Sequence, residues 1–183
     1  MSKIFWVSDT HFFHKNALGW RTQFKTVEEM NEFMAENWKR AVSPDDTVYH
    51  LGDEFLGNAK EAQKLLKSLP GYKILIRGNH STKSDNWYHE AGFAEIHNSL
   101  VLTSPSRPST IRYFIHHEPV PYQALRAMDS MKDGGEYNFI CIHGHLHDST
   151  DVAFTGEDVW THPEKYVNVC VEKTNYTPVE LFL

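Results

Sequence analysis

The sequence predicts an α/β fold in which two β-sheets pack face to face and helices cover the outside. Strand-like runs at 3–7, 47–51 and 73–76 alternate with amphipathic helical segments, a pattern that favours a largely parallel sheet. The second half changes character, because its strand-like runs surround only one clear helical segment, near 123–131. These runs lie at 99–103, 110–116, 138–142 and 166–171. A second sheet packed on the first explains this change.

Two amphipathic helices are expected between the strands of the first half. One begins at a capping box formed by Thr26 and Glu29. One face of this helix is marked by Met30, Phe33, Met34, Asn37 and Trp38. The other helix follows Asn58. Its apolar face consists of Ala62, Leu65, Leu66 and Leu69. Both faces predict core packing, and the right-handed crossovers of such β-α-β units place ligands at the carboxyl ends of the strands.

The length and the loops predict one domain. A chain of 183 residues is long enough to bury roughly 70% of its unfolded surface, so we expect a single domain over residues 1–183. Two prolines in the segment 104–109 indicate a hairpin connection. The segment 148–164 is predicted to be a long polar loop.

Composition and charge exclude several classes of function. The net charge of -6 gives no basic field for long nucleic acid. Neither a signal peptide nor an apolar run long enough to span a bilayer is present, so we expect no membrane partner and a cytoplasmic location. Cys141 and Cys170 lie in apolar strand-like runs, where we expect buried, reduced thiols.

Five polar clusters each follow an apolar run. They are Asp9 with His11, Asp53, Asn79 with His80, His116 or His117, and His145 with His147. Because each cluster stands at the end of a strand-like run, we expect the five to converge at one edge of the sheets. Carboxylate, amide and imidazole groups gathered in this way are the donors of a metal site.

The order of these motifs resembles that of the calcineurin-like metallophosphoesterases. Asp-x-His, Gly-Asp, Gly-Asn-His, a later His before Pro, and Gly-His-x-His follow one another between Ser8 and Glu172. Gly-Asp or Gly-Asn-His alone would be weak, but the ordered set is specific. The resemblance implies a four-layer αββα sandwich and a hydrolase of phosphomonoesters or phosphodiesters.

The resemblance also implies two metal ions per chain. One would be held by Asp9, His11, Asp53 and His147, and the other by Asp53, Asn79, His117 and His145. Asp53 would bridge ions about 3.5–4 Å apart, and a bridging hydroxide would attack phosphorus. Mixed nitrogen and oxygen donors suit manganese, our first choice, or iron, nickel or zinc.

Local geometry supports these pairings. In an extended segment, residues i and i+2 point to the same side, so Asp9 and His11 would face one cavity. Gly52, Gly78 and Gly144 precede motif residues, and we expect them to make sharp turns that use positive φ.

The resemblance assigns catalytic roles to Asp53, Asn79 and His80, with His80 as general acid. The sequence departs from the family here, because Ser81 stands where an acidic residue is usual. A weaker acid is the expected result, which would favour substrates with good leaving groups. Asp85, one helical turn further on, is a candidate substitute.

Several positions keep alternatives open. Of His116 and His117 only one can reach the metals, and His117 is preferred because His117-Glu118-Pro119 resembles the His-x-Pro of the family. His14 could form a hydrogen bond with a ligand carboxylate or a phosphate oxygen, or it could be a structural histidine. Arg77 could bind phosphate or form a structural ion pair.

The function also has alternatives. We expect a small phosphoester substrate, and a nucleotide is one candidate. Within the same enzyme class, a nuclease or a cyclic-nucleotide phosphodiesterase competes with a phosphatase. A non-catalytic interaction module on the same fold and a zinc hydrolase of carbonyl compounds are the other candidates. The oligomeric state stays open, because Trp20 and Phe24 suit either a substrate rim or a dimer contact.

Overall fold

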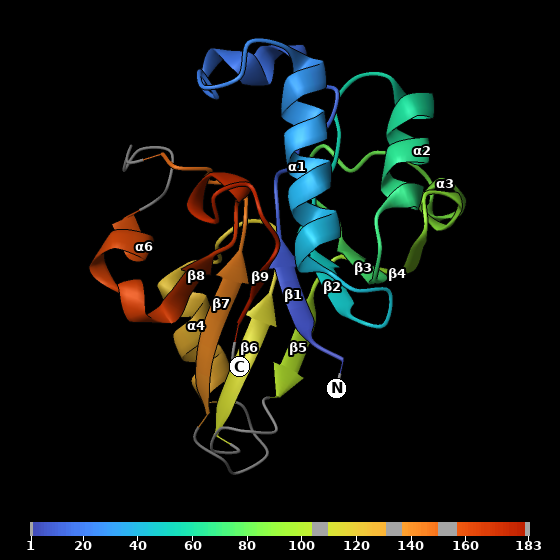
Figure 1. The fold of residues 1–183 in the computed structure, drawn as a ribbon. Helices are drawn as coiled ribbons and strands as arrows, with labels where there is room; N and C mark the ends of the chain where they lie inside the picture. Colours follow the sequence, from blue (N-terminus) through green and yellow to red (C-terminus); the bar gives the residue numbers. More distant parts are fainter. Residues whose placement is uncertain (1, 104–109, 131–136, 150–156, 182–183) are drawn as a thin grey trace.

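Two sheets with helices outside form the fold, as predicted, in a computed structural model that describes residues 2–103, 110–130, 137–149 and 157–181 (Figure 1). The first sheet has the order β4-β3-β2-β1-β9 and the second has the order β5-β6-β7-β8. The strands of the first sheet are β1 (Ile4–Val7), β2 (Thr47–His50), β3 (Tyr72–Ile76), β4 (Phe93–His97) and β9 (Val179–Glu180). Those of the second are β5 (Leu100–Thr103), β6 (Ile111–Ile115), β7 (Asn138–His143) and β8 (Tyr166–Asn168).

Most strands are parallel to their neighbours. β1 to β4 run parallel, and only β9 pairs antiparallel, with β1. In the second sheet β6, β7 and β8 run parallel, and β5 is antiparallel to β6. The register aligns Val7 with His50 and His50 with Leu75, so β1, β2 and β3 end together. The segments that follow these strands therefore leave the sheet at one edge.

The helices begin where their caps predict. The Thr26 hydroxyl accepts a hydrogen bond from the Glu29 backbone N–H at 3.1 Å, and the Asn58 side chain accepts from the first turn of the next helix. The α-helices are α1 (Val27–Ala41), α2 (Ala59–Ser68), α3 (Asp85–Glu90), α4 (Tyr122–Asp129) and α6 (Glu157–Thr161). The 3₁₀ helices are η1 (Lys15–Gly19), η2 (Pro163–Lys165) and η3 (Val171–Lys173).

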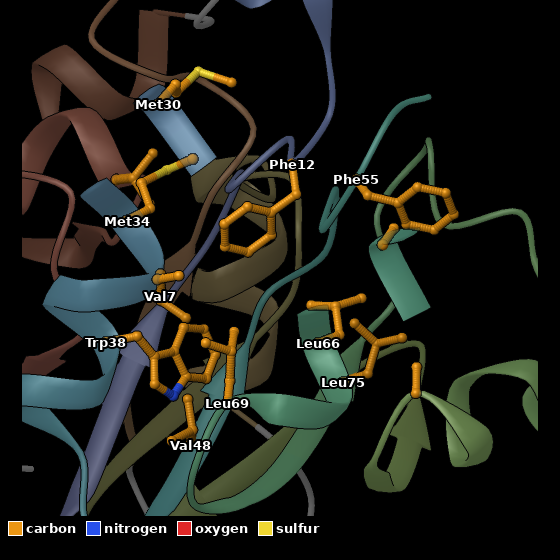
Figure 2. Packing of buried hydrophobic residues seen from close by; sticks show 14 of the residues in the cluster. Val7, Phe12, Met30, Met34, Trp38, Val48, Phe55, Leu66, Leu69 and Leu75 are labelled. Carbon is orange, nitrogen blue, oxygen red and sulfur yellow. The ribbon is translucent and has the colours of Figure 1, made fainter. Parts of the chain in front are cut away.

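Three apolar clusters divide the fold into four layers. One cluster fills the space between the first sheet and its helices, and Figure 2 shows part of it, including Met30, Met34 and Trp38 of α1. The second lies between the sheets, where Trp6 and Ile74 share a cluster with Ile142. The third joins α4 to the second sheet. The result is the αββα sandwich that the resemblance implied.

The second half contains more helix than the sequence predicted. The segment 148–164, expected to be a polar loop, contains α6 and the start of η2, while its residues 150–156 lie outside the described part of the chain. The predicted hairpin connection at 104–109 also lies outside the described residues. Cys141 and Cys170 are free and buried, as expected. None of the described helices is long and apolar enough to cross a membrane.

Candidate metal centre

The carboxyl ends of the strands gather side chains that could hold metal ions. Asp9, His11 and His147 place one donor atom each within 4.8 Å of one another, and so do Asp9, Asp53 and His117. The first group joins the ends of β1 and β7, and the second joins the end of β1 to those of β2 and β6. Segments far apart in the sequence thus meet at the edge where the sheets end.

Asp9 has one carboxylate oxygen that is fixed and one that is open. Oδ2 accepts hydrogen bonds from the Ser8 hydroxyl at 2.5 Å, the His145 backbone N–H at 2.8 Å and the Cys170 thiol at 3.2 Å. Oδ1 is buried and has no hydrogen-bond partner among the described residues. A buried carboxylate oxygen without a partner is costly, so Oδ1 fits a metal ligand better than a structural acceptor.

The open oxygen of Asp9 faces two imidazoles. His147 Nε2 lies 3.7 Å from Oδ1, and His11 Nε2 lies 3.8 Å from it. The separations exceed those of hydrogen bonds and leave room for an ion that all three atoms contact. Oxygen and nitrogen donors on three sides of one point suit a divalent transition metal.

Asp53 divides its two oxygens in the same way. Oδ1 accepts a hydrogen bond from the His80 backbone N–H at 2.9 Å. Oδ2 lies 3.9 Å from His11 Nε2 and 3.5 Å from His117 Nε2. The free oxygen therefore stands between the His11 group and the His117 group, which is the position a bridging carboxylate requires.

A second cluster of donors lies on the far side of Asp53. Asn79 Oδ1 is 2.9 Å from His117 Nε2 and 3.2 Å from His145 Nδ1, and the two ring nitrogens are 3.2 Å apart. His117 Nδ1 donates to the Leu51 carbonyl at 2.6 Å, which turns Nε2 toward this cluster. His116 lies outside it, because its Nδ1 contacts the Glu118 backbone.

The motif pairs reach the cluster through left-handed backbone, so the expected extended geometry is wrong. Among the described non-glycine residues with positive φ are five of the predicted ligands, namely Asp9, His11, Asp53, His145 and His147. Each such conformation costs energy and persists where surrounding contacts enforce it, typically at functional sites. Tight left-handed turns, and not strand alternation, bring i and i+2 to one cavity.

The motif glycines support these turns in two ways. Gly52 has φ of +87°, as predicted. Gly78 and Gly144 are not among the described residues with positive φ, which corrects the expectation for both. A side chain on Gly78 would overlap the Asp53 carboxylate, and one on Gly144 would overlap Ser8 and Asp9. Close approach, and not φ, requires glycine at these two positions.

Comparisons with known proteins agree with this geometry. The family model of the calcineurin-like phosphoesterase superfamily domain matches residues 2–162. The chain belongs to this superfamily. An uncharacterized protein of Methanocaldococcus jannaschii is 34% identical over 191 residues, which cover 100% of this chain and 89% of that protein. The Gene 66 protein of Mycobacterium phage L5 is 39% identical over 83 residues, or 44% of this chain and 40% of that protein.

A solved structure has a similar fold. The crystal structure of a protein of unknown function from Aquifex aeolicus superposes with a TM-score of 0.68 at 25% identity, covering 98% of this chain and 95% of that one. The superfamily assignment therefore rests on sequence and structure together. The names of these relatives state no activity, so they do not identify a substrate for this chain.

The electrostatics of this calcineurin-like site favour an ionised Asp9 beside a neutral His11. Burial opposes ionisation of Asp9, but His117, His147 and His11 outweigh it and lower the pKa of the carboxyl to about 2. Burial lowers the pKa of His11 to about 2, so its ring is neutral near pH 7. Burial also lowers the pKa of His145. An ionised Asp9 and a neutral His11 are the protonation states that metal binding requires. At His147 burial opposes the charged form, but the hydrogen bond to Glu172 and the charge of Asp9 outweigh it and raise the pKa of the ring.

Arg21 and Glu172 support the site, although no sequence motif indicated either role. The fully buried Arg21 guanidinium donates to the carbonyls of Asp9 at 2.6 Å and Thr10 at 2.8 Å, and it pairs with Glu172 at 2.8 Å. Glu172 accepts from His147 Nδ1 at 2.9 Å, which turns Nε2 toward Asp9. Burial raises the pKa of Glu172, but the His147 hydrogen bond and Arg21 outweigh it, so the net shift is downward.

The serine that follows the Gly-Asn-His segment contacts a buried carboxylate. Ser81 Oγ donates to Glu54 at 2.7 Å and accepts from the backbone N–H of Gly78 at 3.0 Å. The Tyr88 hydroxyl donates to the other oxygen of Glu54 at 2.6 Å. Burial raises the pKa of Glu54. A buried carboxylate thus lies beside Ser81, and it comes from Glu54, 27 positions earlier in the chain.

The remaining predicted residues lie around the cluster. His80 is exposed, with its ring centroid 6.1 Å from that of His11. His14 contacts the His11 ring at 5.4 Å between centroids, and no described residue forms a hydrogen bond with its Nδ1. Arg77 donates to Asp85 and to the backbone of Ser81. Of the two roles considered for Arg77, the structure shows the ion pair.

Proposed function

We propose that this chain is a metal-dependent phosphoesterase that holds two divalent cations, with manganese the best match. Asp9, His11, Asp53 and His147 would hold one ion, and Asp53, Asn79, His117 and His145 would hold the other. The substrate would be a small phosphomonoester or phosphodiester. Long nucleic acid is disfavoured by the net charge of -6. Two buried free cysteines support a cytoplasmic location.

The position of Asp53 carries this proposal. One of its oxygens is fixed by the His80 backbone N–H, and the other stands within 4 Å of His11 Nε2 and His117 Nε2. An isolated structural carboxylate has no reason to face two imidazoles from two separate groups. A carboxylate that two cations share has to stand between their other ligands.

The residues of the chain would divide the chemistry among them. When bound, the two cations would lower the pKa of a water molecule and neutralise charge on the phosphoryl group. Glu172 and the Leu51 carbonyl fix the rings of His147 and His117, so the donor atoms are oriented before any ion arrives. His80, exposed beside the cluster, would donate a proton to the alkoxide leaving group.

Ester hydrolysis with controlled metal tests the proposal. Metal-stripped protein is assayed on p-nitrophenyl phosphate and bis(p-nitrophenyl) phosphate after addition of manganese, nickel, zinc or magnesium. We expect manganese to restore turnover, and the preferred substrate will distinguish a phosphatase from a phosphodiesterase. His117→Ala should abolish turnover, whereas its neighbour His116→Ala, which lies outside the cluster, is the matched control.

The same assay separates the alternatives. An interaction module would hydrolyse neither ester with any metal. A zinc hydrolase of carbonyl compounds would cleave p-nitrophenyl acetate and leave both phosphoesters intact. Equal loss of activity in His116→Ala and His117→Ala would contradict the ligand assignment.

A further inference from the structure

A pocket of about 270 Å³ adjoins the candidate metal centre. Its lining among the described residues consists of Trp20, Leu146, His147, Asp148 and Ser149. His147 belongs to both the pocket and the metal cluster, so the pocket lies next to the position where a bound phosphate would be held. Trp20 is the largest side chain of this lining.

Trp20 is exposed, unlike the tryptophans of the core. The residue is 42% exposed, whereas Trp6 and Trp38 are 0% and 1% exposed. An indole left in water loses the transfer free energy that burial would provide, so an exposed one at the rim of a polar site fits a surface that a ligand covers. Phe24, the other residue considered for such a rim, is 8% exposed and packs in the core.

Contacts with the site hold the Trp20 ring in place. It packs edge-on against His14 and His147, each at 5.6 Å between centroids, and against His11 at 6.3 Å. The next residue, Arg21, is anchored to the Asp9 carbonyl and to Glu172. The indole is therefore fixed to the same turns that carry the candidate ligands, and a ligand does not have to order it.

The lining also selects the charge of its occupant. No lysine or arginine is present among the described residues of the pocket, and Asp148 adds a carboxylate. A second phosphate would be repelled there, whereas a neutral planar ring can stack on the indole and cover Leu146. Stacking of this kind accepts any nucleobase or aryl group, because each presents a π-face.

We propose that Trp20 and Leu146 form a subsite for a neutral, planar aromatic group that is esterified to the phosphate. The substrate class is then a nucleoside or aryl phosphoester with one phosphate, and not a polyphosphate or a simple alkyl phosphate. The part of this inference that concerns the reaction rests on the proposed function, but the subsite itself does not.

Ligand binding without metal tests the subsite directly. The indole N–H signals of ¹⁵N-labelled, metal-free protein are followed by NMR during titration with adenosine 5′-monophosphate or ribose 5-phosphate, which differ by the base. Trp20→Phe assigns one of the five indole signals. We expect the nucleotide to shift the Trp20 signal and ribose 5-phosphate to leave it in place. Trp160, which is 46% exposed outside the pocket lining, is the internal control.

Turnover supplies the second readout. With manganese present, kcat/KM is measured on phenyl and propyl esters of whichever class the protein cleaves. The ratio of wild type to Trp20→Ala should be roughly 5- to 150-fold for the phenyl ester and near unity for the propyl ester. Trp20→Phe should retain most activity, and Trp160→Ala should match wild type. Intrinsic differences between leaving groups cancel, because each ratio compares two proteins on one substrate.

The outcomes separate the two proposals. An unshifted Trp20 signal with the nucleotide, or equal effects of Trp20→Ala on phenyl and propyl esters, overturns the subsite and leaves the phosphoesterase standing. Absence of ester hydrolysis in wild type, together with a base-dependent shift of the Trp20 signal, overturns the phosphoesterase and leaves the subsite standing.

Discussion

Removal of the Arg21 guanidinium should lower the stability of the protein, because Arg21 holds groups that support the metal centre. Arg21 is fully buried, and in Arg21→Met the stem volume is largely kept while the charge and all donors are lost. Glu172, with a side chain 5% exposed, would lose its charged partner, and the carbonyls of Asp9 and Thr10 would lose their donors. Breaking a buried pair on one side costs about 3–5 kcal/mol.

Urea unfolding of the metal-free protein at pH 7 measures this loss. With a slope of about 2–3 kcal/mol per molar urea, the midpoint should fall by roughly 1–2.5 M. If the cost comes from the stranded charge of Glu172, the double variant Arg21→Met/Glu172→Gln should be more stable than Arg21→Met alone. A loss below about 1 kcal/mol, or a double variant no better than the single one, would refute this reasoning.

Three further predictions concern the glycines, the general acid and acid stability. Gly144→Ala should lower the free energy of unfolding by about 1–3 kcal/mol and weaken manganese binding, because the new methyl group would displace Ser8 and Asp9. Gly19→Ala is the control. Its methyl group would meet nothing within 4 Å, so stability and manganese binding should not change. His80→Asn should slow hydrolysis of alkyl esters by roughly 10²–10⁴-fold and of p-nitrophenyl esters far less, and equal effects on both would exclude a general acid. Burial lowers the pKa of His50 from 6.5 to about 3, so the unfolded state binds the proton first and stability is lost as pH falls below 6.5. Between pH 6.5 and 5, urea unfolding of metal-free wild type should show about 2 kcal/mol more loss than His50→Asn, and identical pH slopes would contradict this.

The strands and helices of the first half could be predicted because their signals are local. The runs at 3–7, 47–51 and 73–76 match β1, β2 and β3 to within one or two residues, and the capped helices α1 and α2 begin as expected. The short elements α3, β4 and β9 were not predicted. They have two to six residues each, and such segments are held by tertiary packing rather than by propensity.

The candidate site could be predicted only as far as its motifs reach. Convergence follows from strand ends that meet at one edge, so the order of the motifs was sufficient to predict which side chains lie close together. The contacts that support the site could not be predicted, because their partners are far apart in the sequence. Arg21 and Glu172 are separated by 151 positions, and Glu54 and Ser81 by 27. The left-handed turns could not be predicted for another reason, since positive φ is uncommon at non-glycine residues and depends on surrounding contacts that the sequence does not show.

The central claim, a carboxylate shared by two cations, is tested most directly by counting metal ions. Manganese is titrated into metal-stripped wild type and Asp53→Ala, and bound ions per chain are measured together with phosphoester turnover. We predict two ions and metal-dependent turnover for wild type, and the loss of at least one ion and of turnover for Asp53→Ala. Fewer than two ions in wild type, or full turnover in Asp53→Ala, would contradict the account.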